Sequence, residues 1–324
     1  MDLYPLLYSL ADGNFHSGET LGKNIGVTRT AIWKQANALK ALGVELHSVT
    51  GKGYRLPEPM SLLSKEQILA ATQIDRTRLE KYFDLHLSVG STNIEAMKKA
   101  QAGYPQYLVM AEHQSQGRGR RGRTWVSPLG KNLYFSLMWS FQNGISALEG
   151  LSLLTALIVV RALKRVGCTG SLGLKWPNDV LLNGNKLAGI LLEINGDMAG
   201  PCQVVIGIGL NINMPQSAAA AIDQPYADLA DSAVMLNRNS IAAALIDGLL
   251  IELEKFAASG FAPYRQEWES LDVYHSREVQ IQSGASIIEG TVAGVDAGGA
   301  LLLNTSSGIK AISGGEVFPT LRPL

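Results

Sequence analysis

The chain has 324 residues, of which 46% are hydrophobic and 17% charged, with 28 basic and 28 acidic side chains. This length suits two or three domains, and the composition excludes extensive disorder. Because the formal net charge is zero, only local clusters of charge can point to a polyanionic partner. The chain starts without a basic stretch that leads into an apolar run, and polar residues interrupt its most apolar segment, 151–160. We therefore expect a cytoplasmic protein with no membrane insertion.

Neither the cysteines nor the histidines have the spacing of a metal site. Cys168 and Cys202 lie in apolar segments and are expected to be buried, unpaired thiols. The histidines at positions 47, 86, 113 and 275 are scattered. The sequence therefore predicts no metal site built from these side chains.

The first sixty residues combine three helical segments with a hairpin pattern. Leu3, Leu6, Leu7 and Leu10 repeat at helical spacing and predict a first helix that ends before Gly13. Ser17 and Thr28 are the expected N-caps of two further helices, with a turn at Gly26 between them. Their predicted inward positions are Leu21, Ile25, Ile32, Ala36 and Leu39. Residues 44–49 and 54–56 then read as two strands, which predicts a winged helix-turn-helix.

The outward face of the third predicted helix is polar and basic. With both caps and the hairpin tip, it supplies the candidate contacts to DNA phosphates and base edges: Ser17, Thr28, Arg29, Thr30, Trp33, Lys34, Asn37 and Lys52. Residues 1–60 hold six basic and five acidic side chains, so a monomer would bind DNA weakly and we expect a homodimer. A helical module for protein interaction is the alternative.

A proline-containing linker, 57–59, separates this module from a segment that mixes strands with helices. The predicted strands are 85–88, 107–111, 133–139, 172–175, 180–182, 187–194 and 203–208, and the predicted helices are 64–71, 92–102 and 151–166. Thr92 and Glu95 have the spacing of a capping box. Asn183-Gly184-Asn185 predicts a hairpin, so part of the sheet is antiparallel and the fold class is α+β.

The end of the chain changes from helical to short β segments. A helix over 240–258 and a segment over 264–271 precede strands predicted at 279–281, 286–295, 300–303 and 309–312. These strands suggest a small β-barrel. The expected domains are residues 1–60, 61–271 and 272–324.

An arginine loop, residues 117–123, is the most unusual segment of the chain. Arg118, Arg120, Arg121 and Arg123 alternate with three glycines. Because these guanidinium groups repel one another and glycine leaves the backbone free, we expect the loop to be mobile until a polyanion or paired carboxylates gather its charge. A solvated segment with unspecific nucleic-acid contacts is the alternative.

Three further polar motifs follow the loop. They are Lys175-Trp176-Pro177-Asn178-Asp179, Lys186-Leu187-Ala188-Gly189-Ile190 and Gly207-Ile208-Gly209-Leu210-Asn211-Ile212-Asn213. In this order, and with the arginine loop, they resemble the biotin-protein ligases. The resemblance runs end to end and is to the bifunctional form, which also represses a biotin operon.

The resemblance implies a winged helix-turn-helix, a central α/β mixed-sheet ligase domain of the class II synthetase type and a C-terminal SH3-like barrel. It implies that the biotin carboxylate attacks the α-phosphate of ATP, with Mg²⁺ on the phosphates, and forms biotinyl-5'-adenylate. A lysine of the biotin carboxyl carrier protein of acetyl-CoA carboxylase then takes the biotinyl group. With the adenylate as corepressor, the dimer would bind the operator of the biotin operon.

The same resemblance assigns the site residues. Ser91, Thr92, Asn93 and Gln114 match the biotin pocket, and Arg118, Gly119 and Arg120 match the loop that closes over biotin and the acyl phosphate. Lys175, Asp179 and Lys186 match the reaction centre, Asn211 the phosphate and metal side, and Trp125 a position near the adenine. The implied catalytic residues are Arg118, Arg120, Lys175, Asp179 and Lys186.

Several alternatives stay open. Ser91 or Thr92 could be a simple N-cap, Lys175 could only flank the Pro177 turn, and Trp176 is expected in the core. Residues 214–222, which follow the last motif, contain no aromatic side chain, which departs from the pattern of the repressor form. The implied C-terminal barrel could help ATP binding or carrier docking, or be a structural cap. A ligand-sensing transcription factor without chemistry, or a lipoate ligase, are the competing functions.

Overall fold

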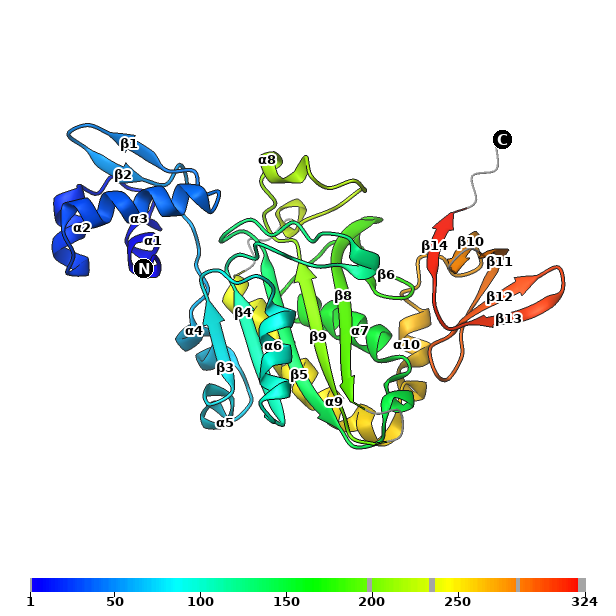
Figure 1. Ribbon diagram of the computed structural model, residues 1–324. Helices are drawn as coiled ribbons and strands as arrows, with labels where there is room; N and C mark the ends of the chain where they lie inside the picture. The colour runs from blue at the N-terminus through cyan, green and yellow to red at the C-terminus, as the bar shows by residue number, and fades with distance from the viewer. Residues whose placement is uncertain (1, 197–199, 233–236, 284–285, 320–324) are drawn as a thin grey trace, which may run out of the picture.

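The computed structural model describes residues 2–196, 200–232, 237–283 and 286–319. These residues form three parts (Figure 1). A helical module with a small hairpin lies at one end of the molecule, a seven-stranded sheet with helices on both faces lies in the middle, and a five-stranded sheet lies at the other end.

The N-terminal module has the predicted order of helices and hairpin. Its elements are α1 (Tyr4–Leu10), α2 (Gly18–Ile25), α3 (Arg29–Ala41), β1 (His47–Val49) and β2 (Gly53–Arg55). The hydroxyls of Ser17 and Thr28 accept hydrogen bonds from backbone N–H groups of α2 and α3, as expected of N-caps. The first strand is shorter than predicted, because Val44 and Leu46 are buried in the core of the module instead of pairing.

The predicted DNA-contacting residues of α3 lie on its outer face. Arg29, Thr30, Lys34 and Asn37 are exposed, and Trp33 has 56% of its surface exposed. Lys52 is exposed in the turn between β1 and β2. The outer face of α3, opposite to its buried stripe, therefore combines polar and basic side chains with one exposed aromatic ring.

The central sheet is mixed, with strand order β3-β4-β5-β9-β8-β7-β6. Among its described strand pairs β3 and β4 are parallel and the others antiparallel. The strands are β3 (Phe83–His86), β4 (Gln106–Ala111), β5 (Leu133–Phe141), β6 (Leu172–Lys175), β7 (Asp179–Leu182), β8 (Asn185–Gly196) and β9 (Cys202–Leu210). A left-handed Asn183 and Gly184 close the predicted hairpin between β7 and β8.

Helices cover both faces of this sheet. α6 (Thr92–Gln101) packs on β4 and β5, and the opposite face carries α7 (Leu151–Arg165) and α9 (Arg238–Ser259). The segment Ile145–Arg165 is long and apolar enough to cross a membrane by composition, but 61% of its most apolar window is buried inside the protein. Its apolar character is explained by packing between the sheet and α9. Cys168 and Cys202 are buried free thiols, as expected.

Shorter helices connect these elements. They are α4 (Lys65–Ala71), α5 (Arg76–Glu80), α8 (Gln216–Ala219) and α10 (Arg265–Glu269), with 3-10 turns η1 (Arg120–Gly122), η2 (Ile145–Leu148), η3 (Leu229–Asp231) and η4 (Ala262–Tyr264).

The predicted capping box at the start of α6 is wrong. Thr92 is the first helical residue rather than the cap, and its N–H and hydroxyl both lie within hydrogen-bond distance of Oε1 of Gln114. Glu95 pairs with Lys98 instead of reaching back to the cap. A side chain from outside the helix therefore satisfies the helix end.

The C-terminal strands form an open antiparallel sheet in the order β13-β12-β11-β10-β14. They are β10 (Glu278–Ser283), β11 (Ser286–Val295), β12 (Leu301–Thr305), β13 (Gly308–Ile312) and β14 (Glu316–Pro319), and β14 was not predicted. Among the described residues β13 and β14 do not pair, so closure into an SH3-like barrel is not confirmed. Trp176, buried as predicted, joins this part to the central sheet by donating its indole N–H to the carbonyl of Gly299.

A buried ion pair fixes the chain that leads out of the N-terminal module. Nη2 of Arg238 lies 2.6 Å from Oε2 of Glu112, and the two side chains are 5% and 0% exposed. The Arg238 guanidinium also donates to the carbonyl of Ser61, and Glu112 accepts from the N–H of Leu63. The chain just after the linker, at Ser61 and Leu63, is thus held by buried charge as well as by apolar contact.

We predict that Glu112→Gln lowers the free energy of unfolding by about 3–5 kcal/mol, because it leaves the buried Arg238 without its counter-charge. Urea unfolding measures this, with Glu267→Gln as control, since Glu267 pairs with Arg161 at the surface. The control should lose less than about 1 kcal/mol. Equal losses in both variants would contradict the account.

Candidate active site

A cavity of about 360 Å³ opens at the end of the central sheet where β8 begins and β9 ends. Its walls come from the arginine loop, the start of α6, the strands β7 to β9, the segment after β9 and the start of β14. The cavity contains the predicted site residues Ser91, Thr92, Asn93, Gln114, Arg118, Gly119, Arg120, Trp125, Lys175, Asp179, Lys186 and Asn211. Segments that are far apart in the sequence thus meet at one place.

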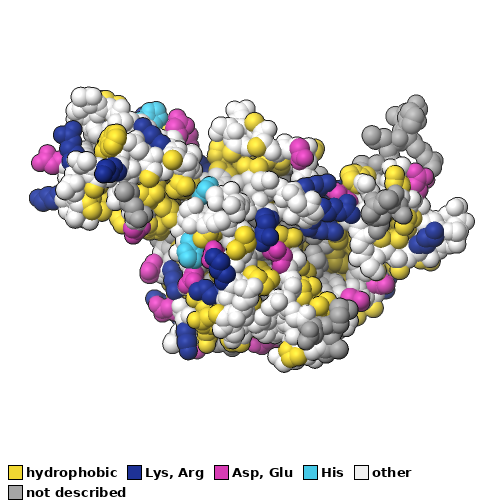
Figure 2. Space-filling model, viewed as in Figure 1, with side chains coloured by type: hydrophobic (Ala, Val, Ile, Leu, Met, Phe, Trp, Pro, Cys, Tyr) yellow, Lys and Arg dark blue, Asp and Glu magenta, His cyan; other side chains and the backbone are white. Residues whose placement is uncertain are grey.

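The cavity is strongly cationic. Its lining includes Arg118, Arg120, Arg121, Arg123, Lys175 and Lys186, against the carboxylates of Asp179, Asp223 and Glu316. In Figure 2, Lys and Arg side chains gather between the central sheet and the C-terminal sheet. A neutral protein therefore concentrates positive charge over one cavity, which favours anionic ligands.

Carboxylates from two other strands hold the arginine loop. Arg118 pairs with Glu193 of β8 at 3.0 Å, and Arg123 makes a two-pronged contact with Glu316 of β14 at 2.8 and 3.0 Å. Arg121 reaches the same Glu316 at 3.4 Å. The loop is thus gathered by protein carboxylates, one of the two conditions predicted to order it.

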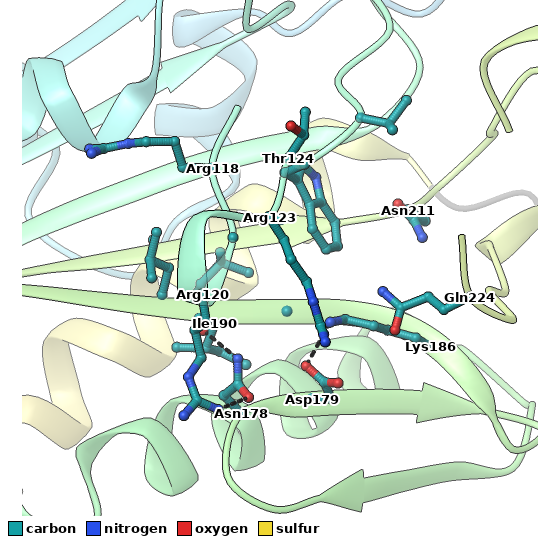
Figure 3. A pocket seen from close by; sticks show the side chains of 18 of the residues that line it. Arg118, Arg120, Arg123, Thr124, Asn178, Asp179, Lys186, Ile190, Asn211 and Gln224 are labelled. Atoms are coloured by element: carbon teal, nitrogen blue, oxygen red, sulfur yellow. Dashed lines mark hydrogen bonds and ion pairs between the residues drawn. The ribbon is translucent and has the colours of Figure 1, made fainter. Parts of the chain in front are cut away.

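Arg120 is held differently, at the edge of the cavity (Figure 3). Its Nη1 donates to Oδ1 of Asn178 at 2.8 Å, and Nδ2 of Asn178 donates to the carbonyl of Ile190 at 2.8 Å. Burial lowers the pKa of Arg120 from its ordinary value, but an arginine stays protonated at neutral pH. Asn178 therefore fixes the direction of a partly desolvated cation.

Two lysines face the cavity from β6 and β8, the strands on either side of β7. Nζ of Lys186 lies 2.9 Å from Oδ1 of Asp179, and both side chains are largely buried (Figure 3). Nζ of Lys175 lies 5.7 Å from the ring centre of Tyr274. Burial lowers the pKa of Lys175, while Asp179 and Glu316 act in the opposite direction. An anionic ligand beside Lys186 would compete with the contact that Asp179 makes in the free protein.

A buried chain of hydrogen bonds forms the far wall. Gln114 accepts from Thr92 and donates to Ser127, while the hydroxyl of Ser136 lies between Thr92 and Asn93. Nδ2 of Asn93 donates to Glu193 at 2.8 Å. Because these groups fix one another, the polar atoms of this wall have defined directions before a ligand arrives.

The floor requires glycine. A Cβ at Gly209 would lie 2.3 Å from the Trp125 ring, one at Gly189 would lie 3.1 Å from it, and one at Gly207 would lie 2.2 Å from Oδ1 of Asn93. The indole of Trp125 therefore rests directly on the backbone of β8 and β9. Its Nε1 has no hydrogen-bond partner among the described residues.

Asn211, at the end of β9, is 3% exposed. Its Nδ2 donates to the carbonyl of Ala227, but its Oδ1 has no partner among the described residues. Met214, Ala221 and Ile222 add an apolar wall next to it, in the segment that crosses over the end of the sheet near α8 (Figure 1). The cavity therefore has a polar, a cationic and an apolar side.

The sequence did not single out three residues that organise this site. Asn178 lies inside a motif that was recognised, but its contact to Arg120 spans 58 positions. Glu193 interrupts the apolar run of residues 187–194 within β8, which is a usable signal of a functional carboxylate. Glu316 gave no local signal, because its role depends on where β14 lies relative to the arginine loop.

Comparison with known proteins agrees with this organisation. Residues 88–211 match the Biotin/lipoate A/B protein ligase family, residues 6–55 an HTH domain and residues 275–318 the Biotin protein ligase C terminal domain. The groups of residues that meet in the cavity fall largely within the first match.

Individual relatives cover almost the whole chain. It is 39% identical to the bifunctional ligase/repressor BirA of Escherichia coli over 96% of this chain and 95% of the relative, and 31% identical to that of Bacillus subtilis over 96% of both. The solved biotin protein ligase of Aquifex aeolicus, in complex with biotin and ATP, is 30% identical with a TM-score of 0.62 and covers 74% of this chain and 98% of that one. The chain therefore belongs to the biotin protein ligase family, in the form that carries an N-terminal HTH domain.

Proposed function

We propose that this protein activates biotin with ATP to biotinyl-5'-adenylate and transfers the biotinyl group to a lysine of the biotin carboxyl carrier protein of acetyl-CoA carboxylase. The observation that carries the proposal is the cavity in which six cations face a polar wall. Membership of the biotin protein ligase family supports the choice of biotin among small acids.

The first step joins two anions, so its barrier contains a large electrostatic part. A carboxylate oxygen of biotin attacks the α-phosphorus of ATP, the bond to the β-phosphate oxygen breaks, and pyrophosphate leaves. At ~4 Å and an effective dielectric constant of ~20, each pair of like charges opposes this approach by about 4 kcal/mol. Arg118, Arg120 and Lys186 are the cations that we propose offset it, since fixed charges need no reorganisation during the reaction.

Magnesium fits the donor set on one side of the cavity. The buried Oδ1 of Asn211 has no partner among the described residues, and Mg²⁺ prefers oxygen ligands from one or two side chains together with substrate phosphates. We propose that Asn211 holds the ion, which when bound neutralises part of the phosphate charge. Lys175 and Asp179 line the cavity from β6 and β7, and Trp125 offers a flat surface for the adenine.

The second step transfers the biotinyl group. The amine of a carrier lysine attacks the acyl carbon, the bond to the adenylate oxygen breaks, AMP leaves, and the nitrogen loses a proton as the amide forms. Arg118, Arg120 and Lys186, the cations proposed to surround the acyl phosphate, stabilise the negative charge that develops on the departing AMP.

We also propose that the adenylate is a corepressor. Ordered loops around the bound adenylate would favour a homodimer, and two α3 helices would then contact the operator of the biotin operon. The HTH match and the repressor named among the relatives support this role. Both activities place the protein in the cytoplasm, where carrier protein and operator occur.

Lys186→Met should lower biotin-dependent exchange of pyrophosphate into ATP by about 100-fold, because it removes a fixed cation at the reacting oxygens. Lys164→Met, at an exposed position of α7, is the matched control and should keep the wild-type rate. Equal rates in both variants would exclude the proposed role of Lys186. Exchange that responds to lipoate as well as to biotin would favour the lipoate-ligase alternative.

Lys34→Ala should weaken binding to a promoter fragment of a biotin-synthesis operon about tenfold in the presence of biotin and ATP, because one phosphate contact is lost in each half of a dimer. A gel-shift titration measures it, with the exposed Lys255→Ala as control. Binding that is unaffected by Lys34→Ala, or that needs no biotin and ATP, would argue against this model.

A further inference from the structure

A carboxylate from the C-terminal sheet reaches into the cavity of the central domain. Glu316 begins β14, where it pairs with Gln282 of β10, and its side chain lines the cavity together with Lys175 and Lys186. Only 21% of this side chain is exposed. This environment differs from that of an ordinary surface carboxylate, because Glu316 lies among the cations that we propose bind ATP and biotin.

Glu316 engages two loop arginines through both of its oxygens. Oε1 accepts from Nη1 of Arg123 at 2.8 Å, and Oε2 accepts from Nη2 of Arg123 at 3.0 Å and Nη1 of Arg121 at 3.4 Å. Burial acts to raise the pKa of Glu316, but Arg123, Arg121 and Lys175 lower it overall. The carboxylate is therefore ionised at neutral pH.

Two backbone carbonyls complete the contact between the C-terminal sheet and the loop. Gln282 accepts from Nη2 of Arg121 at 3.2 Å, and Gly315 accepts from Nη2 of Arg120 at 3.4 Å. Arg120, Arg121 and Arg123 are thus held by β10, by the start of β14 and by the residue before it. Among the described contacts between the loop arginines and the C-terminal sheet, the carboxylate of Glu316 supplies the negative charge, and the other acceptors are backbone carbonyls.

The planar, two-pronged contact that Arg123 makes with a carboxylate is the same contact that guanidinium makes with a phosphate. The triphosphate of ATP carries several negative charges, so it would bring like charge close to Glu316 in the same cavity. The phosphate would compete with Glu316 for the donors that these two arginines already use. It would also bring a second negative charge beside the carboxylate, which favours exchange of one anion for the other.

We propose that Glu316 is a positioning residue of the phosphate subsite: it holds Arg121 and Arg123 in the free protein and is exchanged for phosphate oxygens when ATP binds. This inference rests on the proposed function. The C-terminal domain would then take part in ATP binding. Exchange of Glu316 for phosphate oxygens would release the arginine loop from β14, with Arg121 and Arg123 facing the cavity.

Pyrophosphate binding tests the exchange, since this probe carries the competing phosphates without biotin or adenylation. We expect Glu316→Gln to bind inorganic pyrophosphate about three- to tenfold more tightly than the wild type in calorimetry, because the competing charge is gone. Glu289→Gln is the matched control, since Glu289 lies on β11 of the same sheet and contacts Gln280. It should bind like the wild type.

Trypsin cleavage after Arg121 and Arg123 provides a second readout. Without ligand, Glu316→Gln should be cut about threefold faster than wild type and Glu289→Gln, because the open loop is more populated. Pyrophosphate should bring both variants to the same slow rate. A purely structural role for Glu316 predicts the opposite binding result. Pyrophosphate would then bind more weakly to Glu316→Gln, because the contact that orders the arginine loop is lost.

Unchanged or weakened pyrophosphate binding in Glu316→Gln would overturn the inference, and so would absence of binding to the wild type. A gain in affinity that persists undiminished when Arg123→Gln is added would also overturn it, because Glu316 is proposed to act through Arg123. These outcomes do not depend on biotin. Failure of the proposed function would instead appear as a lack of biotin-dependent pyrophosphate exchange in a protein that still binds pyrophosphate.

Discussion

The structure depends on one electrostatic constraint. The protein must stay folded around a cluster of cations even when no anionic ligand balances their charge. Four arginines and two lysines line one cavity, and each would raise the energy of the others if left unpaired. The protein meets this with carboxylates and an amide placed on other elements: Glu193, Asp179, Glu316 and Asn178. The same contacts define where substrate anions go, because a ligand must replace or join them.

Backbone geometry makes room for this cluster. Gly189, Gly207 and Gly209 let Trp125 and Asn93 lie against the strands, so the floor of the cavity is formed by β8 and β9 themselves. A separate buried charge pair, Arg238 with Glu112, ties the chain just after the linker to the same domain. The HTH module therefore leads directly into the scaffold that carries the cavity, which suits a protein whose DNA binding is proposed to follow its ligand.

Much of this architecture could be predicted from the sequence. Ser17, Gly26 and Thr28 are local signals, and the helix-turn-helix followed from them; the hairpin at Asn183-Gly184 was equally local. The site residues could be grouped because the motifs resemble a known family. The predictions that were wrong or missing depend on contacts between distant segments. Gln114, and not a capping box, satisfies the helix start at Thr92. The strand β14, which was not predicted, lies at the edge of its sheet and places Glu316 in the cavity. Local pattern contains no information about such partners.

The central claim is that fixed guanidinium groups hold the biotin carboxylate against the nucleotide and retain the mixed anhydride that forms. The most direct test is single-turnover formation and release of biotinyl-5'-adenylate by a folded Arg118→Gln/Arg120→Gln variant. The account predicts that adenylate forms more slowly than in the wild type and escapes faster, since both the approach of two anions and the hold on the product lose their cations. Formation at the wild-type rate with an equally long-lived bound adenylate would contradict it.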